Sequence, residues 1–251
     1  MMDAIPDPAS LAFVLIGALV AGFTTGFAGF GTGLVASGLW FHALPAPMVP
    51  PLVALAAVAA HLVGLLTVRR AFEWGQAAPY LLGGALGVPF GVAALSLASP
   101  DTLRLSAGLF LVGYAAFQLL GFARYCIGDW GGRAADGTVG VAGGFLGGFA
   151  GLSGALPLVW LQMRGGPSLR QRATYQPFNL IVLVLASLGM AVSGALDLRV
   201  LTIAVLCLPV TLAGAWAGAR VYTGVSEATF RRVVLMLLLG SGTILVAQTI
   251  E

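Results

Sequence analysis

The sequence contains no lysine, only two cysteines and two histidines, and charged residues at 8% of its 251 positions. Cys126 and Cys207 are too few and too far apart for a metal or redox motif, and no nucleophile with a neighbouring base is recognisable, which argues against an enzyme. With 59% hydrophobic residues and a mean hydropathy of +0.99, the chain has more apolar surface than a soluble domain could bury. The sequence therefore predicts an integral membrane protein with no cofactor, no metal site and no nucleic-acid partner.

Apolar stretches long enough to cross a lipid bilayer recur along the whole chain. They lie at 10–42, 46–68, 75–98, 103–123, 137–163, 173–194, 198–220 and 229–249. The longest hydrophilic piece runs from Arg124 to Gly137 and is expected to be a loop. We therefore expect an all-α fold with a first transmembrane repeat at 1–123, a connecting loop at 124–136 and a second transmembrane repeat at 137–251.

The second half repeats the first. The stretch GFTTGFAGFGTG at 22–33 returns as GGFLGGFAGLSG at 143–154, and placing Gly22 over Gly144 gives the shared pattern GFxxGFAG. A chain built of two such halves is the usual plan of a secondary transporter, with the substrate site at the interface of the repeats.

The first apolar stretch is too long for one straight crossing, because 33 residues of helix would span roughly 50 Å against a hydrocarbon core of about 30 Å. The glycines predict that 10–42 and 137–163 each break into two half-helices and bend back. Ten arginines then share one side, and only Arg104 and Arg199 lie opposite. Since cytoplasmic loops carry the excess of arginine, this predicts two inverted repeats, each a broken or re-entrant segment plus three transmembrane helices, with both termini non-cytoplasmic.

A helix that breaks inside the membrane exposes backbone N–H groups that carry partial positive charge and favour an anion. The predicted substrate-binding residues are those of the two breaks, with Thr32 and Ser153 adding hydroxyl donors: Gly29, Phe30, Gly31, Thr32, Gly33, Gly151, Leu152, Ser153 and Gly154. The alternative is that such glycines, with Gly22 and Gly26, only allow helices to pack closely.

Few polar side chains lie inside the apolar stretches. Gln176 and Asn179 straddle Pro177, and they either contact the substrate or satisfy carbonyls that the proline frees. His61 either responds to a proton or to the anion, or bonds a neighbouring carbonyl. Gln118 and Gln162 lie toward the ends of stretches, where capping or snorkelling is expected.

No Asp or Glu lies deep in an apolar stretch, so the carboxylate relay of many proton-coupled carriers is missing. Export of an anion needs no such relay, because the membrane potential favours it.

The duplicated glycine-rich segment is followed in each half by an acidic residue that opens a later span, in Phe72-Glu73-Trp74 and Leu196-Asp197-Leu198, and then by GGALGVPFG or AGAWAGARV. This layout resembles the sulfite exporter TauE/SafE family of membrane permeases over almost the whole chain. The resemblance implies transport of sulfite, sulfoacetate or a related organosulfonate across the bacterial inner membrane, usually outward. A passive anion channel and an importer of a sulfur compound or another small acid are the alternatives. The glycine-rich faces would also allow a homodimer.

Overall fold

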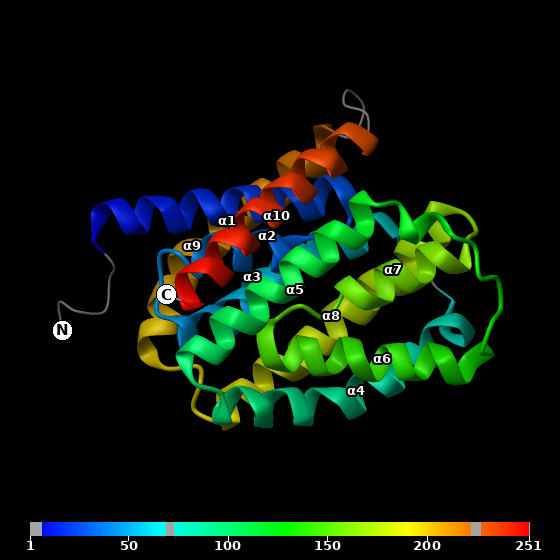
Figure 1. Cartoon of the computed structure of the whole chain (residues 1–251), viewed down its shortest axis with the longest axis horizontal. Helices are drawn as coiled ribbons and strands as arrows, with labels where there is room; N and C mark the ends of the chain where they lie inside the picture. The colour runs from blue at the N-terminus through cyan, green and yellow to red at the C-terminus, as the bar shows by residue number, and fades with distance from the viewer. Residues whose placement is uncertain (1–6, 69–72, 222–226, 251) are drawn as a thin grey trace.

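The computed structural model describes residues 7–68, 73–221 and 227–250 (Figure 1). These ranges contain helices and no strand. The helices are α1 (Pro8–Ala28), α2 (Thr32–Trp40), α3 (Val49–Val68), α4 (Trp74–Leu97), α5 (Pro100–Leu119), α6 (Gly132–Ala150), α7 (Ala155–Arg164), α8 (Ser168–Val192), α9 (Leu198–Val221) and α10 (Glu227–Ile250), with short 3-10 turns at Ala46–Met48 and Phe122–Arg124.

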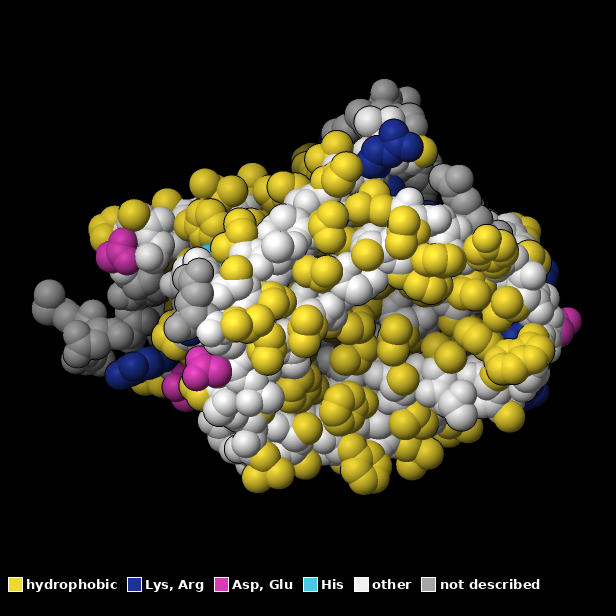
Figure 2. Space-filling model, viewed as in Figure 1, with side chains coloured by type: hydrophobic (Ala, Val, Ile, Leu, Met, Phe, Trp, Pro, Cys, Tyr) yellow, Lys and Arg dark blue, Asp and Glu magenta, His cyan; other side chains and the backbone are white. Residues whose placement is uncertain are grey.

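Seven of these helices are long and apolar enough to cross a membrane: α1, α3, α4, α5, α8, α9 and α10. The outer face of α4 shows the expected lipid-facing surface, because Leu82, Leu86 and Phe90 are 69%, 65% and 69% exposed. In Figure 2 hydrophobic side chains cover the middle of the molecule, while charged side chains lie toward its ends. The predicted all-α, multi-pass membrane fold is confirmed.

Both predicted breaks are also confirmed. The chain leaves helical geometry between α1 and α2 and again between α6 and α7. Gly29 and Gly31 have φ angles of 80° and 108°, and Gly151 has a φ of 73°. Residues with a Cβ rarely adopt these left-handed conformations, so glycine is what allows the helix to stop at these positions.

After each break the second half-helix folds back along the first. In the first hairpin (α1 and α2), Trp40 Nε1 donates to the Val14 carbonyl at 3.0 Å. In the second hairpin (α6 and α7), Trp160 Nε1 donates to Asp136 Oδ1 at 2.8 Å. Val14 and Asp136 hold matching positions, since each lies eight residues before the paired Gly-Phe of its repeat. Both segments therefore bend back, as the sequence predicts.

The two halves pack against each other through pairs of helices. The first arm of each hairpin packs against a long helix of the other half, α1 against α9 and α6 against α4, while α3 packs on α8 and α5 on α10. Figure 1 shows α4 and α6 side by side. A Cβ on Gly26 would overlap the Ala215 carbonyl oxygen. A Cβ on Gly148 would clash with the Val88 carbonyl oxygen. Helix packing is therefore the role of these glycines, whereas Gly29, Gly31 and Gly151 form the breaks. The inverted orientation of the halves across a bilayer stays a prediction.

The boundary before the second hairpin differs from the expectation. Helix α6 begins at Gly132, inside the segment 124–136 that we expected to be loop. The cause is Asp136, whose Oδ1 accepts hydrogen bonds from Tyr80 (2.6 Å), Trp160 and Arg164 (2.7 Å), which hold the polar first turns of α6 against α4 and α7. Of the arginines used for the topology argument, Arg69 and Arg70 lie outside the described residues.

Candidate functional site

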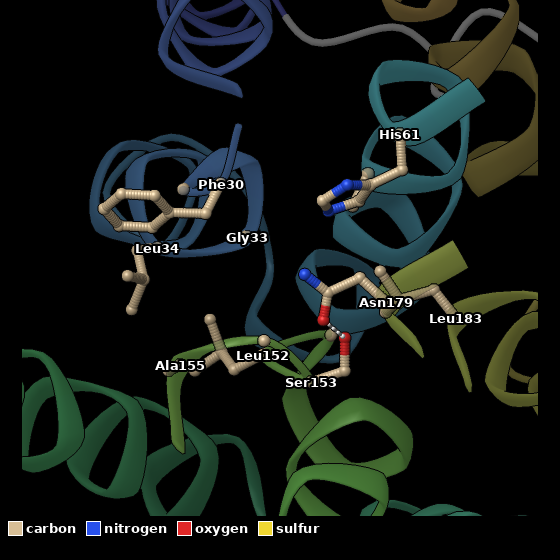
Figure 3. A pocket seen from close by; sticks show the side chains of 13 residues that line it. Phe30, Gly33, Leu34, His61, Leu152, Ser153, Ala155, Asn179 and Leu183 are labelled. Carbon is tan, nitrogen blue, oxygen red and sulfur yellow. Dashed lines mark hydrogen bonds between the residues drawn. The ribbon is translucent and has the colours of Figure 1, made fainter. Parts of the chain in front are cut away.

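The two breaks meet inside the molecule. A Cβ on Gly33, in the first turn of α2, would lie 2.7 Å from the Gly151 carbonyl oxygen of the second break. Between them lies a small cavity, which we call the central cavity (Figure 3). Its lining comes from both breaks and from α3 and α8: Phe30, Gly31, Gly33, Leu34, Ala57, His61, Gly151, Leu152, Ser153, Gly154, Ala155, Asn179 and Leu183. Nine of the twelve predicted site residues are thus brought together.

The central cavity lies at the positive ends of two helix dipoles. Helix α2 begins at Thr32 and helix α7 at Ala155, so the N-terminal ends of two half-helices border the same space. The first N–H groups of a helix have no partner within the helix, and they carry the positive end of its dipole. The described residues of this lining include no carboxylate.

Two polar side chains complete the lining. His61 is buried, 4% exposed, and its Nδ1 has no hydrogen-bond partner among the described residues, so the alternative of a bond to a neighbouring carbonyl is not seen for this nitrogen. Ser153 Oγ donates to Asn179 Oδ1 at 3.1 Å. In Figure 3 the His61 ring and the amide nitrogen of Asn179 both point toward the space beside Gly33. They leave an imidazole and an amide donor available to a ligand.

Helix α8 reaches both breaks with the two amides beside Pro177. Asn179 contacts Ser153 in the second break, whereas Gln176 Nε2 donates to the Gly29 carbonyl of the first break at 3.3 Å. These bonds go to the hairpins and not to the carbonyl that Pro177 frees within α8. The two amides therefore position the hairpins relative to each other.

Three predicted site residues lie outside the cavity lining. Gly29 and Gln176 form the capped end of α1. For Thr32 the prediction of a substrate-facing hydroxyl needs correction, because that hydroxyl pairs with the Thr25 hydroxyl and lies 3.4 Å from the Ala21 carbonyl. Thr25 also accepts from the Thr32 backbone N–H at 2.8 Å, so this pair closes the break from within.

Sequence reasoning missed two side chains at the end of α1. Arg172 Nη2 donates to the Phe27 carbonyl at 3.2 Å, and the Tyr175 hydroxyl donates to the Ala28 carbonyl at 3.3 Å. Carbonyls at a helix C-terminus lack intrahelical partners, so these donors cap a helix end that stops inside the protein. The signal was present in the spacing, since Arg172, Tyr175, Gln176 and Asn179 repeat at the three- and four-residue intervals of one helix face.

A multi-pass helical bundle whose two broken helices meet at one central cavity has the plan of a membrane transporter. The family model of the sulfite exporter TauE/SafE family matches residues 14–245. The chain belongs to this family, whose members are membrane transporters of sulfur anions. No match was found among curated proteins or among solved structures.

Proposed function

We propose that the protein is a secondary transporter that exports a small sulfur-containing anion, sulfite, sulfoacetate or a related organosulfonate, by alternating access around the two broken helices. The observation that carries the proposal is the convergence of the α2 and α7 N-termini on a cavity whose described lining residues include no carboxylate. Sulfite and sulfonate groups carry several oxygens that accept backbone N–H donors, as anions at helix N-termini do.

The central cavity is closed around the N-termini of α2 and α7. Its volume, taken as the space open to the centre of a water-sized sphere, is about 20 Å³. That is room for about one water molecule, so binding of an anion requires the hairpin tips to separate. Alternating access is then a rocking of the two halves that opens the cavity first to one side and then to the other.

The driving force in this proposal is the membrane potential. With a negative cytoplasm, moving one negative charge outward is favoured by about 2.3 kcal/mol per 100 mV, enough for roughly a fifty-fold gradient. The arginine distribution supports an orientation in the bacterial inner membrane with the ends of α7 and α9 at the cytoplasm and both termini outside. His61, the one titratable side chain of the central cavity lining, would report a proton in the cycle if one takes part.

The test is counterflow in proteoliposomes loaded with sulfite, sulfoacetate, taurine or lactate, with the variant Asn179→Asp beside the native protein. Asn179→Asp keeps the oxygen that Ser153 contacts and places a carboxylate at the cavity, so we expect exchange to fall by about tenfold or more through like-charge repulsion. Gln248→Glu is the matched control, because it makes the same chemical change on the exposed face of α10.

Exchange of a sulfur oxyanion that Asn179→Asp abolishes and Gln248→Glu preserves supports the carrier and its site. Unitary currents without counterflow would instead make the protein a channel. Exchange of lactate alone would overturn the proposed substrate class. Equal exchange by the native protein and Asn179→Asp would remove the central cavity from the pathway.

A further inference from the structure

Two further cavities continue the central cavity beyond Phe30. Phe30 lines both the central cavity and an inner neighbour of about 50 Å³, measured in the same way. Gln162 and Arg231 line this inner cavity and also an outer one of about 210 Å³. The three cavities therefore form a row, with Phe30 between the first and the second. We call the inner and outer cavities together the arginine vestibule.

Arg231 lines both the inner and the outer cavity of the arginine vestibule, as Gln162 does. Its Nη2 donates to Oε1 of Gln118 and, at 3.0 Å, to Oε1 of Gln162. Gln118 Nε2 in turn donates to Gln162 Oε1 at 3.2 Å and to the Tyr114 hydroxyl at 3.3 Å. Amides from α5 and α7 thus fix the guanidinium of α10, and they do so through one of its three nitrogens.

Among the residues that the structure describes, no carboxylate balances the charge of Arg231. The described residues that line the arginine vestibule include no carboxylate, and no described carboxylate lies within ion-pair distance of Arg231. Arg164 differs, because its Nε lies 2.7 Å from Asp136 Oδ1. Arg172 adds a second cation to the inner cavity. A half-buried guanidinium held by neutral amides has donors left for an anion, and its planar fork matches two oxygens of an oxyanion.

We infer that Arg231 binds a small oxyanion of the sulfite or sulfonate class in the arginine vestibule, before the anion passes Phe30 into the central cavity. This inference rests on the proposed function and deepens it. It adds a second binding site at the end of the molecule that the arginine distribution assigns to the cytoplasm. Gln118 and Gln162 are then positioning residues, since they hold the guanidinium that meets the anion.

The first test measures charge in the vestibule without measuring transport. Ser168, an exposed residue that also lines the inner cavity, is changed to cysteine in a protein that carries Cys126→Ser and Cys207→Ala. The probes are two thiol reagents of similar size, the anionic sulfonatoethyl and the cationic trimethylammonioethyl methanethiosulfonate. We expect Arg231→Gln to lower the ratio of anionic to cationic reaction rates by at least about fivefold, the effect of one unit charge at contact distance in a wet site.

Two matched variants make this result specific. Arg231→Lys restores the charge and should restore most of the ratio. Arg220→Gln removes an arginine that packs over the Trp216 ring and lines neither cavity of the vestibule, so it should leave the ratio unchanged. An unchanged ratio in Arg231→Gln overturns the inference. An equal fall in Arg220→Gln also overturns it, because the reagents would then report only the general surface charge.

The second test uses sulfite and sulfoacetate exchange. Arg231→Gln should raise the KM for anion added on the vestibule side by about tenfold and leave the KM on the opposite side unchanged, since an outer site acts only on entry from its own side. If exchange is seen and both KM values stay the same, the vestibule site fails while the proposed function stands. If no anion is exchanged but the reagent ratio responds to Arg231, the proposed transport fails and the anion site remains.

Discussion

The two hairpins have the same shape and are held in opposite ways. The first is held at its tip, where Arg172, Tyr175 and Gln176 of α8 donate to the last carbonyls of α1. The second is held at its open end, where Asp136 ties α6 to Arg164 of α7 and to α4. Its own tip closes with backbone hydrogen bonds and one neutral bond from Ser153 to Asn179 of α8, and it packs on apolar residues of α3.

Because the first hairpin is held at its tip and the second at its open end, the strong polar contacts lie at one end of the molecule. The tip of the first hairpin and the end of α7 both line the arginine vestibule, so the α8 caps and the Asp136 network lie toward the same side. At the other side the first hairpin is held by neutral bonds, from Trp40 to the Val14 carbonyl and through Ser241 of α10 to His42 and the Gly38 carbonyl, together with apolar packing. The two hairpins thus share a broken-helix shape but differ in their polar contacts, and the contacts that involve charged side chains lie at the vestibule side.

The largest predicted effect tests the part that the hairpins share. Gly26→Val and Gly148→Val should each abolish a monodisperse peak in fluorescence-detected size-exclusion chromatography, because the new side chain meets the backbone of α9 or α4. Gly113→Val is the control, since nothing lies within 4 Å of a Cβ there. If one substitution is tolerated and the other is not, the α1–α9 and α6–α4 pairs do not depend on close glycine contacts in the same way.

The second prediction concerns the open end of the second hairpin. Asp136→Asn should lower the free energy of unfolding by about 3 kcal/mol, because it leaves the nearly buried Arg164 without its close carboxylate. Asp129→Asn removes a carboxylate that lies 3.4 Å from Arg164 but is fully exposed, and should change the melting temperature in detergent little. Similar melting temperatures for the two variants would contradict the fastening described for this hairpin.

The third prediction concerns the tip of the first hairpin. Tyr175→Phe keeps the buried ring and removes the donor to the Ala28 carbonyl, so it should cost about 1 kcal/mol of stability. Tyr125→Phe makes the same change at an exposed position and should cost nothing measurable. Thermal unfolding of both variants in the same detergent gives the comparison, and a neutral Tyr175→Phe would mean that the cap is not what holds the tip.

The sequence predicted the breaks because their cause is local. Glycine at 29, 31 and 151 both interrupts the helix and marks the repeat, so pattern and conformation coincide. Position 61 was predicted for a similar reason, since a histidine inside an apolar run is rare. The contacts of Arg231 could not be predicted from a local sequence pattern. Gln118 and Gln162 lie 113 and 69 residues from Arg231 along the chain, and only the packing of α5, α7 and α10 brings the three together.

The smallest predicted effect on stability falls at the tip of the second hairpin. Ser153→Ala removes a hydroxyl that donates to Asn179 in a tip already closed by the bonds from Gly151 to Gly147 and from Leu152 to Leu146. We expect a loss of about 0.5–1 kcal/mol, no more than one neutral hydrogen bond contributes. Ser96→Ala, at an exposed site on α4, serves as the control.

Transport should respond to Ser153→Ala more than stability does, because the freed Asn179 amide would no longer be fixed beside the central cavity. An exchange rate that falls several-fold while the melting temperature stays near the native value separates orientation of the amide from folding. If the melting temperature falls as far as it does in Asp136→Asn, the second tip is fastened as firmly as the open end of its hairpin, and the contrast between the two hairpins does not hold.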